Sequence, residues 1–240
     1  MANSSWAELS DALQSNLHLT AAPMAITFAS EPPPDVAPFD APMPSPAPDG
    51  RTGRVPAGCV FWMHGSDRTF STVAQDHANC SVGSMTHGFK TLDEVAGNGD
   101  VAALLESGWV TMDVVPQIPV VHEKPGAVVY GPLAATRVDP DVVFIRLNAK
   151  QLMVLSDAVP GLRVEGKPQC HIVAIAKEQG EIAASVGCML SRVRTGMPST
   201  EMTCAIPASK LAEVVASIER NAVADAAVAR YASQDAQRFS

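Results

Sequence analysis

The chain has 240 residues, of which 47% are hydrophobic, and it carries a formal net charge of −8 with a pI near 5.2. This length allows one large domain or two small ones, and a core of that size needs no disulfide. An acidic chain without a cluster of lysines and arginines lacks the basic face that nucleic acids and anionic membranes require, so we expect neither as a partner.

The N-terminal segment, residues 1–8, has neither a positively charged start nor an apolar run, so it does not have the pattern of a secretory signal. The sequence also lacks the run of ~18 apolar residues that a membrane-spanning helix requires. We therefore expect a cytoplasmic protein. Because thiols stay reduced in the cytoplasm, the five cysteines are expected to be ligands, catalysts or core residues rather than disulfides.

In chain order, the first predicted element is a helix over residues 6–19, because apolar side chains recur on one face and Ser5 and Glu8 have the spacing of a capping box. A short buried strand over residues 23–28 follows. Proline dominates residues 31–56, which excludes a regular helix or a central strand and predicts a surface loop. This loop is either a connector or a lid or partner-binding arm.

Further along the chain, short helices and strands alternate, which predicts an α/β or α+β fold with a mixed sheet flanked by helices. We expect a single domain over residues 1–220, including the proline-rich loop, and a C-terminal helix or tail over residues 221–240. The expected helices cover residues 59–64, 92–109 with an interruption at 97–99, 148–158, 170–177 and 207–220, and the expected strands cover residues 70–74, 128–133, 142–147, 182–186 and 202–206. In residues 76–89 the apolar side chains follow neither the repeat of a helix nor the alternation of a strand.

Four cysteines are the main candidates for a functional site: Cys59, Cys80, Cys170 and Cys188. All but Cys170 have a glycine within three residues, and glycine lets the backbone approach a bulky ligand and frees N–H groups to donate to sulfur. Cys80 and Cys188 are also expected near helix starts, where the helix dipole favours a thiolate. The spacing contains no C-x-x-C pair, so four buried core cysteines are the alternative. Cys204, in a strand-like run without a nearby glycine, is predicted to be a core residue.

Histidine and arginine side chains near these cysteines are the candidates for catalysis. His77 and His87 flank Cys80, and either could give a proton to a bound substrate. Arg192, which follows the last of the four cysteines, could fix a carboxylate or phosphate of a substrate or balance the charge of thiolates. The alternatives are histidines satisfied by backbone carbonyls and an arginine in a surface salt bridge, for which Glu201 is the expected partner.

Common catalytic templates do not occur in the sequence. It has no G-x-S-x-G nucleophile elbow, no glycine-rich phosphate loop and no H-E-x-x-H zinc motif. Nucleophilic serine catalysis and nucleotide binding of the usual types are therefore not predicted.

Several segments, taken in their order, resemble one protein family. They are a first helix followed by PMAITF (23–28), then NCSVG (79–83), PDVVF (140–144), QLM (151–153) and GCMLSR (187–192), with Glu201 and the Ile206–Pro207 step after them. The chain resembles the uncharacterised family called domain of unknown function 169 over most of residues 5–220. The resemblance implies that the four cysteines act together, and metal or iron–sulfur binding is the usual inference for such a quartet. The proline-rich stretch and the setting of His77 and His87 depart from the family's pattern.

The cysteines and the resemblance together predict a metalloprotein whose ligands are Cys59, Cys80, Cys170 and Cys188. An iron–sulfur cluster, above all a 4Fe–4S cluster, would serve redox or Lewis-acid chemistry on a small-molecule substrate, so the expected enzyme is an oxidoreductase or a lyase or hydrolase. The predicted catalytic residues are His87 or His77 as proton donor and Arg192 as substrate anchor.

Two other functions remain open from the sequence. One is a haem-binding enzyme with a cysteine or histidine axial ligand in an apolar pocket lined by Phe61, Trp62 and Met63. The other is a zinc-stabilised or metal-free module that binds a small molecule without chemistry. The alanine-rich residues 221–240 suit contact with a second copy of the chain or docking on their own domain equally well, so a homo-oligomer also stays open.

Overall fold

The computed structural model describes residues 5–40, 58–166 and 168–239, and a seven-stranded mixed sheet forms its centre. The strands are β1 (Met24–Ala29), β2 (Phe70–Thr72), β3 (Ala127–Pro132), β4 (Val142–Leu147), β5 (Arg163–Glu165), β6 (Ala183–Ser185) and β7 (Met202–Pro207). Their order across the sheet is β2-β3-β1-β4-β7-β6-β5. Neighbouring strands are antiparallel except β5 and β6, which are parallel.

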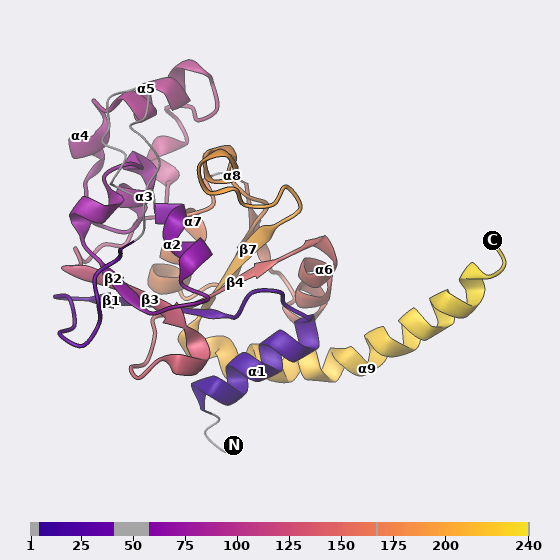
Figure 1. The fold of residues 1–240 in the computed structure, drawn as a ribbon. Helices are drawn as coiled ribbons and strands as arrows, with labels where there is room; N and C mark the ends of the chain where they lie inside the picture. The colour runs from indigo at the N-terminus through magenta and orange to yellow at the C-terminus, as the bar shows by residue number, and fades with distance from the viewer. Residues whose placement is uncertain (1–4, 41–57, 167, 240) are drawn as a thin grey trace.

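Helices cover both faces of this sheet, which gives three layers (Figure 1). They are α1 (Trp6–Leu17), α2 (Gly58–His64), α3 (Ser81–Thr86), α4 (Leu92–Val95), α5 (Gly99–Glu106), α6 (Ala149–Ala158), α7 (His171–Ala174), α8 (Met189–Thr195) and α9 (Leu211–Ala236). Single turns of 3₁₀ or π helix add η1 (Ala74–His77), η2 (Val115–Gln117), η3 (Leu133–Ala135), η4 (Ile175–Gln179) and η5 (Ala208–Lys210). None of the described helices is both long and apolar enough to cross a bilayer.

Strand β4 shows how the sequence divides the interior into two cores. Val142 and Phe144 lie in the core under one face of the sheet, whereas Val143 and Ile145 lie in the core under the other. This alternation is the two-residue period of a strand, and a strand apolar at every position must be covered on both faces.

The first core packs α1, α6 and α9 against the sheet, and Leu13, Leu155 and Leu211 are fully buried there. Local signals in the sequence fix where these helices begin. Helix α1 has the predicted capping box between Ser5 and Glu8, and α6 begins at an equivalent box in which Asn148 is the N-cap. Both boxes satisfy backbone N–H groups that a helix start leaves unpaired.

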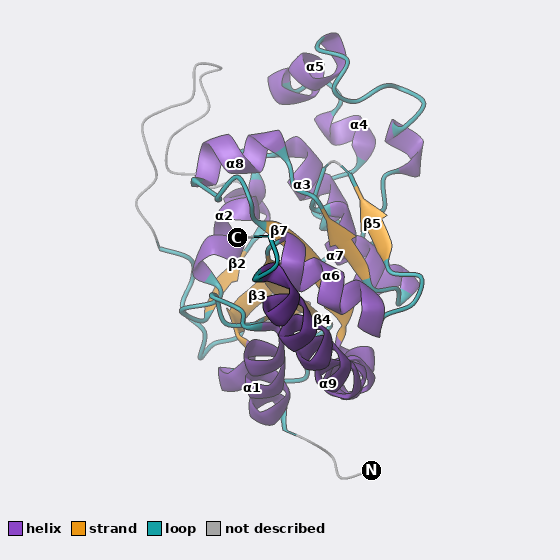
Figure 2. Cartoon of the chain, turned by 90° about the vertical axis from the view of Figure 1, so that its right-hand side faces the viewer, coloured by secondary structure: helices purple, strands orange, loops and turns teal. Residues whose placement is uncertain are grey.

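The second core lies under α2, α3 and α7 on the opposite face of the sheet, the side that also carries α8 (Figure 2). Trp62 of α2 is almost fully buried and stacks on Phe144 of β4, with ring centroids 4.8 Å apart. Phe61, beside it in sequence, packs against Tyr130 of β3. Burial of these large rings holds α2 firmly on the sheet and positions the residues that follow the start of the helix.

The predicted fold class, an α/β protein with a mixed sheet flanked by helices, is confirmed. Residues 76–89, which fitted neither period, form η1 and α3. Strand β5 and helix α8 were not predicted, and α9 continues without a break past residue 220, where the sequence suggested a separate C-terminal helix or tail. Residues 41–57 of the proline-rich stretch lie outside the described residues, while Pro38 within it forms a bridge with Ser71.

Candidate functional site: a pocket lined by four thiols

Each of the four candidate cysteines lies at the start of a short helix. Cys80, Cys170 and Cys188 are the N-cap residues of α3, α7 and α8, and Cys59 is the second residue of α2. The expected positions of Cys80 and Cys188 near helix starts are thus confirmed. Helix α2 contacts α3 and α8, and α3 contacts α7, so the packing of these helices brings the four starts together.

The four thiols line one pocket, whose cavity of about 30 Å³ holds roughly one water molecule. Cys170 and Cys188 are buried, whereas Cys59 and Cys80 are partly exposed, so the pocket runs from the surface towards the sheet. Other side chains that line it include Trp62, His87, Trp109, Gln169, Leu190 and Arg194. Most of the wall is apolar, as expected for a site that takes up an organic molecule.

Burial keeps three thiols of this pocket, those of Cys59, Cys80 and Cys170, protonated. Desolvation, and next the neighbouring thiol of Cys80, raise the pKa of Cys59 to about 12. Desolvation also raises the pKa of Cys80, although Gly83 N donates to its Sγ at 3.3 Å and favours the thiolate. The pKa of Cys170 is raised well above its usual range by burial and then by the charge of Cys80. The helix-start effect expected from the sequence is therefore outweighed by desolvation.

The predicted metal site is wrong. Among the described residues, no group of three or more His, Cys, Asp or Glu side chains is placed to hold a metal ion, which removes both the iron–sulfur cluster and the zinc site. A physical reason is that each cysteine is placed by a different short helix, so no single loop directs the four sulfurs to one point. Gly83 N also donates to the Sγ of Cys80. Thiols that line one pocket form a metal site only if their sulfurs all lie within bonding distance of the same ion or cluster.

The predicted haem site is wrong as well. A cavity of about 30 Å³ is about a tenth of the smallest pockets that hold drug-sized ligands, and a haem is larger still. Of Phe61, Trp62 and Met63, which were expected to line a haem pocket, only Trp62 lines this cavity, and Phe61 is fully buried among core side chains. The described residues thus support no metal or haem cofactor at this site.

His87 lies at the buried end of the pocket and is only 1% exposed. Its Nδ1 lies 2.9 Å from the carbonyl oxygen of Gly83, and because a carbonyl can only accept, Nδ1 must carry the proton. Nε2 of neutral His87 is therefore an acceptor, and it has no hydrogen-bond partner among the described residues. Burial lowers the pKa of His87 to about 4, so the ring is neutral at pH 7.

His77 does not line the pocket but packs behind His87, with ring centroids 5.4 Å apart. It is fully buried, and its Nε2 lies 3.0 Å from Oγ1 of Thr72. Since that hydroxyl donates to the carbonyl of Val128, it accepts from His77. Burial, and then the charge of His87, lower the pKa of His77 well below its usual range. The structure thus brings the two predicted histidines together, one at the pocket and one supporting it.

Gln169 is a pocket residue that sequence reasoning missed. It is 1% exposed, and its Nε2 donates to Ser191 Oγ at 3.0 Å, which fixes the side-chain amide. Its Oε1 has no partner among the described residues. A buried amide between Pro168 and Cys170 has no signal in the sequence, because nothing local distinguishes it from a surface glutamine.

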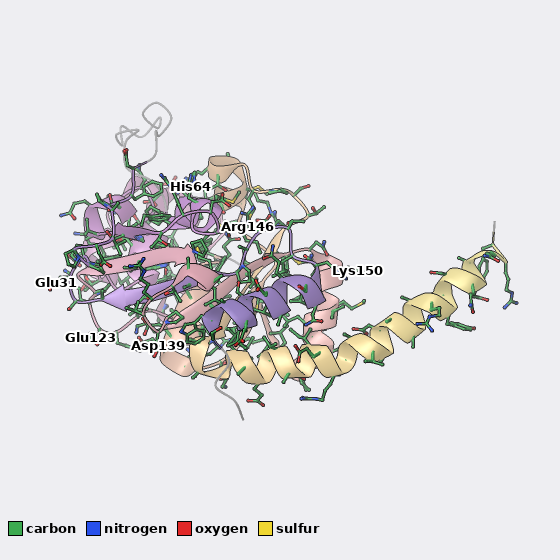
Figure 3. The ribbon with its side chains drawn as sticks, turned by 60° about the horizontal axis from the view of Figure 1, so that its bottom comes forward. Glu31, His64, Glu123, Asp139, Arg146 and Lys150 are labelled. Atoms are coloured by element: carbon green, nitrogen blue, oxygen red, sulfur yellow. The ribbon has the colours of Figure 1, made fainter. Side chains whose placement is uncertain are left out.

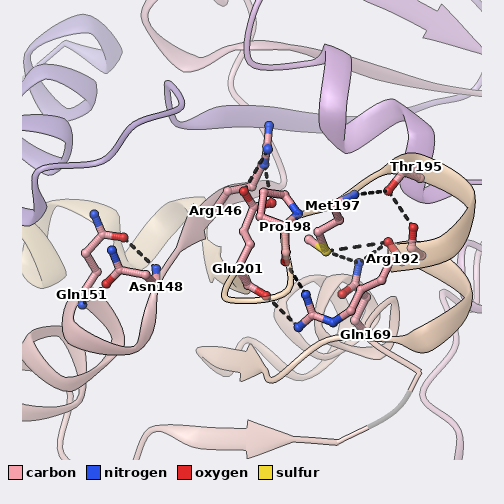
Figure 4. A network of polar contacts seen from close by, with 10 residues as sticks. Arg146, Asn148, Gln151, Gln169, Arg192, Thr195, Met197, Pro198 and Glu201 are labelled. Carbon is pink, nitrogen blue, oxygen red and sulfur yellow. Dashed lines mark hydrogen bonds and ion pairs between the residues drawn. The ribbon is translucent and has the colours of Figure 1, made fainter.

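Arg192 is used by the protein backbone rather than by the pocket. Its guanidinium donates to the carbonyl oxygens of Pro198 and Glu201 (Figure 4) and to that of Val186, which ties the end of β6 to the loop before β7. The carboxylate of Glu201, expected to pair with Arg192, instead accepts two bonds from Arg146 at 2.7 and 2.9 Å. The arginine that lines the pocket is Arg194, which follows Arg192 by two residues in α8.

Arg194 and Asp100 hold the outer part of the pocket. Arg194 donates from Nη1 to the carbonyl of Asn79 at 3.1 Å, next to Cys80, and lies at the partly exposed side. Asp100 accepts from both the backbone N and the hydroxyl of Ser81, at 2.9 and 2.7 Å, and so anchors the first turn of α3. The sequence pointed to Arg194 only alongside Arg192, and it gave no signal for Asp100, which acts on a segment far from it in the chain.

Cys204 is fully buried in β7, in the core between the sheet and α1, α6 and α9, and does not line the pocket. Burial raises the pKa of its thiol. The sequence predicted that Cys204 is a core residue and that the other four cysteines, marked by a nearby glycine or a helix start, form a site. The placement of Cys204 away from the pocket agrees with this division.

Comparison with known proteins adds a family but no activity. The family model DUF169, described as "Uncharacterised ArCR", matches residues 12–217. No curated protein and no solved structure matches the chain.

Proposed function

Because the chain belongs to the uncharacterised DUF169 family, for which no activity is described, we propose a function from its own residues: the pocket binds a small, uncharged organic molecule that carries O–H or N–H groups. The observation that carries this proposal is the pair of buried acceptors His87 Nε2 and Gln169 Oε1, both without partners among the described residues and both on residues that line the pocket. An unpaired buried polar atom costs about 1–3 kcal/mol, which a donor on a ligand offsets.

The charge of the pocket supports an uncharged ligand. The thiols of Cys59, Cys80 and Cys170 are protonated and His87 is neutral at pH 7, so these residues offer no countercharge to an ion. Burying an isolated charge there would cost far more than burying a hydrogen-bonding neutral group. Arg194, at the outer side, would donate to a carbonyl or hydroxyl oxygen at the end of the ligand that stays near solvent.

The proposal requires the pocket to open, because its cavity holds roughly one water molecule. A ligand larger than water needs the outer wall to move, and Leu190 and Arg194 of α8 belong to this wall. Two residues of this seven-residue helix, Met189 and Val193, expose large apolar side chains, at 63% and 77%, and opening would have to release the bond from Arg194 to the carbonyl of Asn79. A reducing compartment such as the cytoplasm would keep the four thiols free of disulfides and the pocket open to ligand.

Phenol and toluene form a matched pair of probes, since they have similar shapes and only phenol has an O–H donor. We expect phenol to slow the alkylation of Cys59 and Cys80 by N-ethylmaleimide several-fold, measured by peptide mass spectrometry under reducing-agent-free, anaerobic conditions. Toluene should protect less. The substitution His87→Phe, which keeps a ring but removes the acceptor, should abolish the difference between the two probes.

His171→Phe is the control variant, because His171 is another buried histidine with an unpartnered Nε2 but does not line the pocket. It should keep the preference for phenol. Equal protection by phenol and toluene in the unmodified protein would mean that the buried acceptors serve only a trapped water, and the proposal would then fail. The catalytic roles predicted for His87, His77 and Arg192 stay predictions, and binding alone does not require them.

A further inference from the structure

The second half of α9 leaves the body of the protein. The buried residues of this helix are Leu211, Val214, Val215 and Ile218, all in its first half, where it packs against α1 and α6. From residue 223 onwards nearly every side chain is exposed. Figures 1 and 3 show this half projecting away from the sheet and its helices.

Such a segment gains little from its own chain. Isolated helices of fewer than ~12–15 residues are marginal in water even when rich in alanine, because tertiary packing normally supplies most of a helix's stability. The projecting half also exposes large apolar side chains, among them Val228 at 66% and Tyr231 at 67%. An exposed helix with such side chains is expected to pack against something.

One face of the projecting half has a definite pattern of charge and size. Arg220, Ala224, Ala227, Tyr231 and Asp235 follow one another at intervals of three or four residues and so share a face. The face begins with a positive charge, ends with a negative charge, and places small residues and a large aromatic ring between them. Reversing the direction of the helix exchanges the two charges, which makes the face complementary to itself.

We propose that this face pairs with the same face of a second copy of the chain, with the two helices antiparallel and related by a two-fold axis. The register that sets Arg220 opposite Asp235 of the partner subunit also sets Ala224 opposite Tyr231 of the partner subunit. Val228, four residues after Ala224 and three before Tyr231, lies at the edge of this face, and at the centre the register sets it opposite Ala227 of the partner subunit. Each large side chain then faces an alanine, and the two-fold axis repeats every contact. The inference is independent of the pocket and goes beyond the proposed function.

A parallel pair would bring like charges together at both ends of the face, which disfavours it. A single pair of helices buries less surface than a standard interface, so the dimer is expected to depend on concentration. The observed molar mass should rise from 25.2 kDa towards twice that value as the protein is concentrated through the micromolar range.

Exchanging the charges of Arg220 and Asp235 tests the register directly, with dimerisation measured by sedimentation velocity. Asp235 also accepts from Arg238 of its own chain, so all variants carry Arg238→Ala, a background expected to dimerise. Arg220→Asp should weaken dimerisation at least tenfold, because two acidic groups then face each other at each end. Arg220→Asp combined with Asp235→Arg should restore it, since the exchange recreates both pairs.

Arg230→Asp is the matched control, because Arg230 lies on the same exposed half of α9 but on a different face. It should leave the dimerisation constant within twofold. Far-ultraviolet circular dichroism checks that every variant keeps its helix content. A chain that stays monomeric at all concentrations would overturn the proposal, and so would a double variant that fails to recover or a control that weakens as much as Arg220→Asp.

Discussion

His87 and His77 lie ring against ring in the interior, and burial keeps both neutral at pH 7. Each uses one ring nitrogen as a donor, to Gly83 and Thr72 respectively, and each has a second nitrogen without a partner among the described residues. Neutral imidazoles of this kind accept hydrogen bonds, so His87 suits the recognition of a donor better than the delivery of a proton. Proton donation by His87 would require it to be protonated, which burial opposes.

The lowered pKa of His87 predicts acid sensitivity. The unfolded chain binds a proton at this residue below a pH of about 6.5, while the folded protein does so only below about 4. The unfolded state therefore holds more protons in this window, and the free energy of unfolding should fall as the pH falls from about 6.5 to about 4. His87 alone should contribute a loss of about 3 kcal/mol.

Urea unfolding at a series of pH values measures this loss. His87→Gln, which has no group that titrates in this range, should make the free energy of unfolding less dependent on pH between 6.5 and 4. His77 contributes in the same direction, so some dependence should remain. An unchanged pH profile in the variant would contradict the assignment of this acid sensitivity to His87.

At the scale of the elements, the loop between β6 and α8 depends on one glycine. Gly187 has φ +114°, outside the range that residues with side chains favour, and a Cβ at this position would lie 2.5 Å from Nη2 of Arg192. The glycine before Cys188 was expected to bring backbone close to a ligand. It instead makes room for Arg192, which holds the loop by its bonds to backbone carbonyls.

Gly187→Ala should therefore destabilise the protein by about 2–4 kcal/mol, the sum of backbone strain and a steric clash. Gly196→Ala is the matched control, because Gly196 also has a positive φ (69°) but no atom near the position of a Cβ. The control should cost about 1–2 kcal/mol, from strain alone. Chemical denaturation of both variants measures the difference, and equal losses would show that Arg192 moves aside without cost.

At the scale of the whole molecule, α9 serves the core only through its first half. Leu211 and Ile218 are almost fully buried against α1 and α6, whereas the residues beyond Ala222 lie outside the core. The helix thus joins two parts with different physical roles. One is a core element, and the other is a projecting surface that we assign to a second copy of the chain.

Deletion of residues 223–240 should change the free energy of unfolding by less than about 1 kcal/mol when measured at a dilution where the chain is monomeric, because it removes no buried apolar side chain. Leu211→Ala, by contrast, should cost about 2–5 kcal/mol, since it opens a cavity in the core. Thermal or chemical unfolding of the two variants checks the contrast. A large loss on deletion would mean that the projecting half supports the fold.

The sequence by itself determined the elements with strong local signals. The apolar period and a capping box located α1, Asn148 as a plausible cap helped to locate α6, and short runs rich in apolar residues located β4 and β7, because these patterns act over neighbouring residues. Weak or short elements such as β5 and α8 were missed, since three to seven residues carry little periodicity and their stability comes from tertiary contacts. The resemblance to the family was likewise readable from the order of its segments.

Only the tertiary structure decided what the cysteines do. The sequence indicated that four of them belong together, and the packing of α2, α3, α7 and α8 does place them around one pocket. The sequence could not show that the described residues bring no metal-holding group together, or how far burial raises the pKa of Cys59, Cys80 and Cys170. Gln169 was missed for the same reason. Placement and desolvation depend on contacts between residues far apart in the chain, and no local pattern encodes them.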